Sequence, residues 1–307
     1  MKIALWSIGI LVLLIAVLFG HRDIQLDELK AKYAQHPSKF MALNGVEVHY
    51  RDEGRSSESI PLVLIHGTGS SLHTFNDWAE ELKKDYRVIR MDLPGYGLTG
   101  PFPEPDYSID AYVGFIEQFL DSMGVDKCLI GGNSLGGHIA WRFATEYPKR
   151  INKLILINSA GYPNKSKSEP IAFRVAKTPV LRNALTFITP KSIARSSIEN
   201  VYADKTKVTE ELVDRYFELT LRAGNRQAFI DRFSAKKDPN AYKRIRQIQQ
   251  PTLILWGDQD ELIPVENAER FHRDLPNDTL VILENAGHVP MEEIPERSLE
   301  VVKAFLD

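Results

Sequence analysis

Lys127-Cys128-Leu129-Ile130-Gly131-Gly132-Asn133-Ser134-Leu135-Gly136-Gly137 is the stretch that decides the fold of this chain. The apolar residues at its start predict a buried strand, and Ile139–Ala144 after it predicts a helix. Gly132 to Gly136 therefore form a G-x-S-x-G turn between a strand and a helix. Such a turn strains the backbone of Ser134 and exposes its hydroxyl, and side chains at Gly132 or Gly136 would collide with the flanking elements. We predict that Ser134 is a nucleophile; the alternative is a glycine-rich turn with a solvated serine.

Composition narrows the class of protein. The 307 residues are 43% hydrophobic, carry a net charge of −3 and have a sequence pI of about 6.3. Without a basic run or interleaved aromatic and basic residues, nucleic acid is not an expected partner. The only cysteine, Cys128, excludes an intramolecular disulfide and a multi-cysteine metal site.

The N-terminus departs from this composition, because Ile3–Phe19 is apolar except for Ser7 and Gly9. That length is close to the minimum for a membrane-spanning helix, and the small residues of a cleavage site are missing. We expect a single-pass membrane anchor through residues 3–20, within an N-terminal segment 1–22, followed by a linker over 23–38. The globular part is then expected outside the cytoplasm, periplasmic or extracellular, or secreted if the segment is a cleaved signal peptide.

Strands and helices alternate in the rest of the chain. Apolar runs such as Leu62–Ile65, Leu154–Ile157 and Leu253–Trp256 predict buried strands, with helical segments between most of them. This pattern predicts an α/β fold, a mostly parallel central sheet with helices on both faces. Ligands of such sheets bind at the carboxyl ends of the strands, where Ser134 lies.

The alternation stops between two late strands. We predict a core of residues 39–160 and 246–307 and a helical cap of residues 161–245 on the ligand side. Six side chains are candidates for an apolar cap lining, although helix-on-helix packing explains at least half of them: Phe173, Leu185, Phe187, Tyr202, Phe217 and Phe229.

A nucleophilic serine needs a base, and the base needs an acid to fix its tautomer. His288 lies in a short loop after the last predicted strand and is the expected base. Asp260 lies in the loop after the preceding strand and is the expected acid, with Asp258 and Glu261 as alternatives. The order serine, aspartate, histidine is that of one group of hydrolases.

With these motifs together, residues from about 40 to the C-terminus resemble the α/β-hydrolase superfamily. The resemblance implies that Ser134, Asp260 and His288 act as nucleophile, acid and base. It also implies an oxyanion hole from the amides of Leu135 and Thr68, and no metal or organic cofactor. The motifs are His66-Gly67-Thr68-Gly69, Asp92-Leu93-Pro94-Gly95-Tyr96-Gly97, Gly132-Asn133-Ser134-Leu135-Gly136-Gly137, Trp256-Gly257-x-x-Asp260 and Gly287-His288.

Residue identity narrows the expected activity. Serine at position 134 argues against the dehalogenase and epoxide-hydrolase branches, which carry aspartate there. The chain looks most like the serine esterase and lipase branch (monoacylglycerol-lipase-like), acting on a small ester or lipid through an acyl-enzyme. The turn from Gly132 to Gly136, called the elbow below, also resembles that of C–C bond hydrolases of meta-cleavage products. Those enzymes usually have a tryptophan directly after the base histidine, whereas this chain has Val289. A third hypothesis is a catalytically silent, ligand-binding hydrolase fold.

Overall fold

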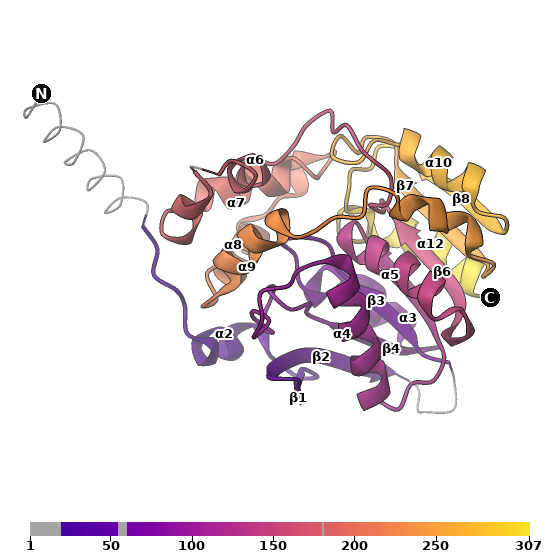
Figure 1. Ribbon diagram of the computed structural model, residues 1–307, viewed down its shortest axis with the longest axis horizontal. Helices are drawn as coiled ribbons and strands as arrows, with labels where there is room; N and C mark the ends of the chain where they lie inside the picture. Colours follow the sequence, from indigo (N-terminus) through magenta and orange to yellow (C-terminus); the bar gives the residue numbers. More distant parts are fainter. Residues whose placement is uncertain (1–19, 55–59, 180) are drawn as a thin grey trace, which may run out of the picture.

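A mixed eight-stranded sheet forms the centre of the computed structural model, which describes residues 20–54, 60–179 and 181–307 (Figure 1). Its strand order is β1-β2-β4-β3-β5-β6-β7-β8. β2 pairs antiparallel with β1 and β4, and the other neighbours pair in parallel, so the predicted mostly parallel sheet is confirmed. The strands are β1 (Lys39–Leu43), β2 (Val46–Gly54), β3 (Leu62–Ile65), β4 (Arg87–Met91), β5 (Cys128–Asn133), β6 (Ile151–Ile157), β7 (Thr252–Gly257) and β8 (Asp278–Leu283).

Helices cover both faces of the sheet because its central strands are apolar on both sides. Every residue of β3, β5 and β7 is buried, as expected for parallel strands between two helical layers. One face packs against α4, α5 and α10, and the other against α3, α11 and α12. These helices are α3 (Asn76–Leu82), α4 (Ile109–Ser122), α5 (Leu135–Glu146), α10 (Glu266–Asp274), α11 (Pro290–Glu293) and α12 (Pro295–Leu306), with short 3₁₀ turns η1 (Leu72–Phe75), η2 (Pro148–Arg150) and η5 (Ala241–Gln247).

The segment between β6 and β7 is helical, and its helices gather on one side of the sheet (Figure 1). Thr209 begins α8 with a side-chain cap on the amide of Leu212. The aromatic rings of Phe173, Phe229 and Phe233 pack together between α6 and α9. The elements are α6 (Ile171–Ala176), η3 (Arg182–Thr186), α7 (Lys191–Glu199), η4 (Lys205–Lys207), α8 (Glu210–Thr220) and α9 (Asn225–Ser234).

Residues 20–38 lie against these helices rather than apart from them. Gly20 bridges to Ile188, and the carboxylate of Asp23 pairs with Arg226 at 2.7 Å. Helix α2 (Leu26–Tyr33) buries Leu29. Residues 20–38 are therefore attached to α8 and α9 by polar and apolar contacts.

The predicted single-pass anchor must be corrected. Among residues 20–54, 60–179 and 181–307, no helix has the length and apolar character needed to cross a bilayer. The first described helix, α2, has eight residues, among them Asp27, Glu28, Lys30 and Lys32, and eight residues span only about 12 Å of a hydrocarbon core of about 30 Å. The apolar segment 3–20 itself, apart from Gly20, lies outside the described residues.

Candidate active site

Ser134 occupies the sharp turn between β5 and α5 with φ 55° and ψ −112°, a conformation that L-residues rarely adopt. A Cβ atom on Gly132 would lie 2.2 Å from the carbonyl carbon of Gly136, and one on Gly136 would lie 2.1 Å from the carbonyl oxygen of Ile65. Both positions therefore accept glycine alone, for the steric reason that the sequence suggested.

The structure brings Asp260 and His288 together from different loops. Asp260 Oδ2 accepts a hydrogen bond from His288 Nδ1 at 2.7 Å, and both side chains are buried. The other carboxylate oxygen accepts from the amides of Leu262 and Ile263, each at 2.9 Å. Asp258 and Glu261, the alternative acids, are exposed. A Nδ1–H donor leaves Nε2 of His288 as the basic nitrogen.

Two asparagines that sequence reasoning missed complete this arrangement. Asn158 Nδ2 donates to Asp260 Oδ2 at 2.7 Å, and Asn133 Nδ2 donates to the carbonyl of His288 at 2.9 Å. Asn158 directly follows β6 in a left-handed conformation with φ 43°. Their position in the sequence could have indicated this role, because each asparagine lies at the carboxyl end of a buried strand, on the side of the sheet where ligands bind.

Ser134 and His288 line the same cavity, as does Thr68. No hydrogen bond joins the Ser134 and His288 side chains in the described part of the chain. Leu135 is the first residue of α5, so its amide has no acceptor within the helix and is free for an oxyanion. Thr68 and Leu135 meet with Ser134 in the wall of a second cavity. Their assignment to an oxyanion hole stays a prediction.

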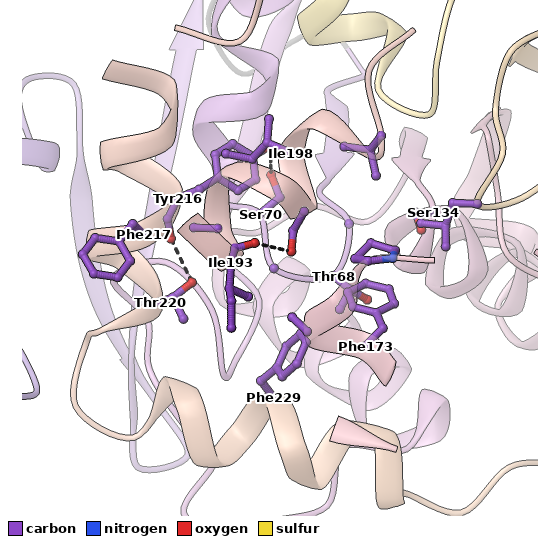
Figure 2. Close-up of a pocket in the computed structure, with 18 of the residues that line it drawn as sticks. Thr68, Ser70, Ser134, Phe173, Ile193, Ile198, Tyr216, Phe217, Thr220 and Phe229 are labelled. Atoms are coloured by element: carbon purple, nitrogen blue, oxygen red, sulfur yellow. Dashed lines mark hydrogen bonds between the residues drawn. The ribbon is translucent and has the colours of Figure 1, made fainter. Parts of the chain in front are cut away.

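The first cavity is apolar and runs from the elbow under the cap helices. It encloses about 1040 Å³ of empty space, its open mouth included. Figure 2 shows Ser134 and Thr68 at one end and Phe217 and Thr220 of α8 at the other. Of the six predicted lining residues, four line it, whereas Phe187 is 72% exposed and Tyr202 packs in the core. The apolar wall includes Phe173, Leu185, Ile193, Ile198, Phe217 and Phe229.

The second cavity shares Ser134, Thr68, Phe173 and Leu262 with the first and has about 940 Å³ of empty space. Its walls are more polar than those of the first cavity. Three basic side chains, Lys177, Arg232 and Lys237, contribute to it.

A second chain of serine, histidine and aspartate lies away from both cavities. His49 Nδ1 lies 2.7 Å from Asp92 Oδ2, and its Nε2 lies 2.8 Å from Ser38 Oγ. His49 is fully buried. Burial alone would raise the pKa of Asp92, but its pairing with His49 holds that pKa well below the usual range. Asp92 also accepts hydrogen bonds from the amides of Leu72 and Leu98. These hydrogen bonds therefore join Ser38, directly before β1, to the segments that follow β3 and β4.

His66 is likewise structural. Its Nε2 accepts from the amide of Leu93 at 2.9 Å, and burial lowers its pKa despite the nearby Asp92. Within the described ranges, no three His, Cys, Asp or Glu side chains gather as a metal site would require.

Comparison with known proteins identifies the family. A family model for the alpha/beta hydrolase fold matches residues 60–295. A 2-hydroxy-6-oxononadienedioate/2-hydroxy-6-oxononatrienedioate hydrolase of Pseudomonas putida is 29% identical over 269 residues, covering 85% of this chain and 92% of that protein. The structure of a membrane phospholipase A, a bacterial virulence factor, matches with a TM-score of 0.75 at 26% identity, covering 100% of this chain and 96% of that one. A thermophilic esterase from Thermogutta terrifontis matches with a TM-score of 0.73 at 25% identity, covering 88% and 97%. The chain is thus a hydrolase that belongs to the alpha/beta hydrolase fold family.

Proposed function

We propose that this protein is a serine-dependent carboxylic-ester hydrolase of the esterase and lipase type. The observation that carries the proposal is the long apolar cavity that opens on Ser134 and His288. A cavity walled by Phe, Leu and Ile side chains favours an alkyl or acyl chain, because burial of apolar surface stabilises the complex by about 25 cal/mol per Å². The phospholipase A and the esterase among the similar structures support the same class.

The proposed mechanism assigns one role to each group. His288 Nε2 removes the proton from Ser134, whose Oγ attacks the ester carbonyl. The amides of Thr68 and Leu135 stabilise the resulting oxyanion. His288 then protonates the leaving alcohol, and water releases the acid from the acyl-enzyme. Asp260 fixes the tautomer of His288 through the 2.7 Å hydrogen bond and stabilises the imidazolium that forms.

Hydrolysis of a C–C bond is the second candidate. The Pseudomonas putida relative is a hydrolase of 2-hydroxy-6-oxo dienedioates, and the basic side chains of the second cavity suit a substrate that carries carboxylates. The walls of the first cavity are mostly apolar, and Arg226, the guanidinium among its lining residues, is already paired with Asp23. These walls favour ester hydrolysis, because a charged substrate arm would be desolvated there.

Hydrolysis of p-nitrophenyl esters from acetate to hexadecanoate, by the wild-type protein and Ser134→Ala, tests the proposal. We expect turnover with an optimum at medium or long chains, reduced at least ~10³-fold in the variant. Hydrolysis of a 2-hydroxy-6-oxo-dienoate, which tests the C–C bond activity, is measured beside the esters by the decrease in its visible absorbance.

The outcomes separate the candidates. Faster cleavage of the dienoate than of every ester would establish the C–C activity and overturn the ester proposal. Absence of turnover together with absence of fluorophosphonate labelling at Ser134 would favour the catalytically silent, ligand-binding fold instead.

A further inference from the structure

The second cavity carries more positive than negative charge. Lys177 of the turn after α6 forms an ion pair with Glu169. Arg232 of α9 and Lys237 beyond it form no ion pair with any residue in the described ranges. The cavity wall therefore holds three cations and one carboxylate, all within the segment that covers the elbow.

The three cations lie close enough to affect one another. Desolvation and the charges of Arg232 and Lys177 lower the pKa of Lys237, while Glu169 acts in the opposite direction. Nε of Arg232 is buried and has no hydrogen-bond partner among the described groups. Three cations that share the one carboxylate of Glu169 repel one another, and an anion bound among them would remove part of this repulsion.

The position of the cluster ties it to the reaction centre. The cavity that the cations line also contains Ser134 and the two residues of the predicted oxyanion hole, Thr68 and Leu135. Ser134 is thus shared by an apolar cavity on one side and a basic cavity on the other. A substrate bound with its carbonyl at Ser134 extends one arm into each.

We propose that the preferred substrates are esters with an apolar arm and an anionic arm, the carboxylate or phosphate of the latter bound by Arg232, Lys237 and Lys177. This inference rests on the proposed ester hydrolysis and specifies its substrate class. Arg232 supplies a planar donor set suited to two anion oxygens. Lys237 and Lys177, which are exposed residues that line the cavity, supply charge.

Two matched pairs of esters test the charge preference and show which arm carries it. In the first pair the alcohol differs: the decanoyl ester of glycerol phosphate against that of glycerol. In the second pair the acid differs: the octyl monoester of pentanedioic acid against octyl pentanoate. The ratio of kcat/KM for the anionic and neutral member of each pair is measured by titration of the released acid.

We expect the anionic ester to have a kcat/KM roughly ten times that of the neutral ester in one of the two pairs. We expect this ratio to fall as the ionic strength rises. In Lys237→Gln the ratio falls several-fold through a higher KM for the anionic ester, and Lys237→Glu lowers it further. Lys236→Gln and Lys236→Glu are the matched controls, because Lys236 is the exposed neighbour outside the cavity wall, and they leave the ratio unchanged. Arg232→Gln tests the half-buried member of the cluster in the same way, and Arg232→Lys is expected to restore part of the ratio.

The results distinguish this inference from the proposal on which it rests. Equal kcat/KM for the charged and neutral members of both pairs, with active hydrolysis of the neutral esters, overturns the anionic subsite and leaves the ester hydrolase intact. Equal effects of the Lys237 and Lys236 variants also overturn it. Failure to hydrolyse any of the four esters overturns the ester hydrolase itself.

Discussion

Asn158 shows how much of the site depends on a single amide. It donates to the same oxygen of Asp260 that accepts from His288, at the same distance of 2.7 Å. Its own Oδ1 accepts from the amide of Gly257 at 3.3 Å. The side chain therefore holds the acid in position without facing the cavity, and we regard it as a positioning residue.

Asn158→Asp tests this role. The substitution keeps the size and the tolerance for positive φ but replaces the donor with a second carboxylate beside Asp260. We expect kcat to fall about ten- to a hundred-fold. The added negative charge near His288 also shifts the acidic limb of the kcat/KM profile to higher pH. An unchanged pH profile would contradict the assigned contact, even if activity fell.

His73 makes stability depend on pH. It is 6% exposed, its ring bonds to Ser71 and to the carbonyl of Tyr33, and burial lowers its pKa to about 3, although Asp92 acts to raise it. Between pH 3 and the unfolded value of about 6.5, the unfolded chain binds more protons here than the folded one. Stability from this group is therefore fully present above about pH 6.5 and decreases as the pH falls.

We expect the free energy of unfolding to lose about 1 kcal/mol through His73 between pH 6.5 and 5.5. Urea unfolding of the wild type and His73→Gln across this range measures the difference in slope. His36→Gln, at an exposed histidine, serves as the control. Parallel slopes for the wild type and His73→Gln would show that His73 does not carry the effect.

At the scale of elements, we expect the substitution of glycine by alanine to have opposite effects on stability in α4 and in α5. Helix propensity alone favours alanine over glycine by about 1 kcal/mol inside a helix. Gly114 of α4 has no atom within 4 Å of an added Cβ, whereas a Cβ on Gly136 of α5 would meet the carbonyl oxygens of Ile65 and His66 at 2.1 and 2.7 Å.

We expect Gly114→Ala to stabilise the protein by up to about 1 kcal/mol and Gly136→Ala to destabilise it by about 3 kcal/mol or more. Denaturant unfolding measures both. Because α5 would have to move away from β3, the second variant also loses activity. If both variants changed stability equally, the close approach of α5 to the end of β3 would be wrong.

Most helices and strands could be predicted from the sequence because the residues that determine each of them are neighbours in the chain. Runs such as Leu253–Trp256 are apolar throughout, and the glycine spacing around Ser134 permits one kind of turn. Asp260 and His288, the proposed acid and base, were predictable as loop residues after β7 and β8. Asn158, Asn133 and the burial of His49 were not, since each depends on pairing between strands that are distant in sequence. The three cations of the second cavity likewise come from the turn after α6, from α9 and from the segment beyond α9, which share no motif.

At the scale of the whole molecule, the segment before β1 contributes to the cavity. Arg226 lines the apolar cavity and is 6% exposed, and its Nη2 donates to the carbonyl of His21 and to Asp23. Residues 20–23 therefore hold a cavity-wall side chain in position. The sequence had suggested the end of an anchor segment up to residue 22 and a linker from residue 23.

Asp23→Asn leaves the buried guanidinium of Arg226 without its carboxylate. We expect it to destabilise the protein by about 1–2 kcal/mol and to raise KM more for long esters than for acetate. Asp27→Asn, at an exposed aspartate in α2, should change stability by less than about 0.5 kcal/mol. Thermal unfolding and the ester series measure both, and equal effects of the two variants would argue against the contact.

The buried chain of Ser38, His49 and Asp92 has a practical consequence. In its order of contacts it imitates a catalytic triad, with the histidine between the serine at 2.8 Å and the aspartate at 2.7 Å. A search for the contact geometry of a serine, histidine and aspartate triad would therefore return these three residues. Neither cavity reaches Ser38, and its oxygen also accepts from Arg51. Reagent access, rather than the spacing of three side chains, distinguishes Ser134, the proposed nucleophile, from Ser38, so an active-site probe should modify Ser134 and spare Ser38.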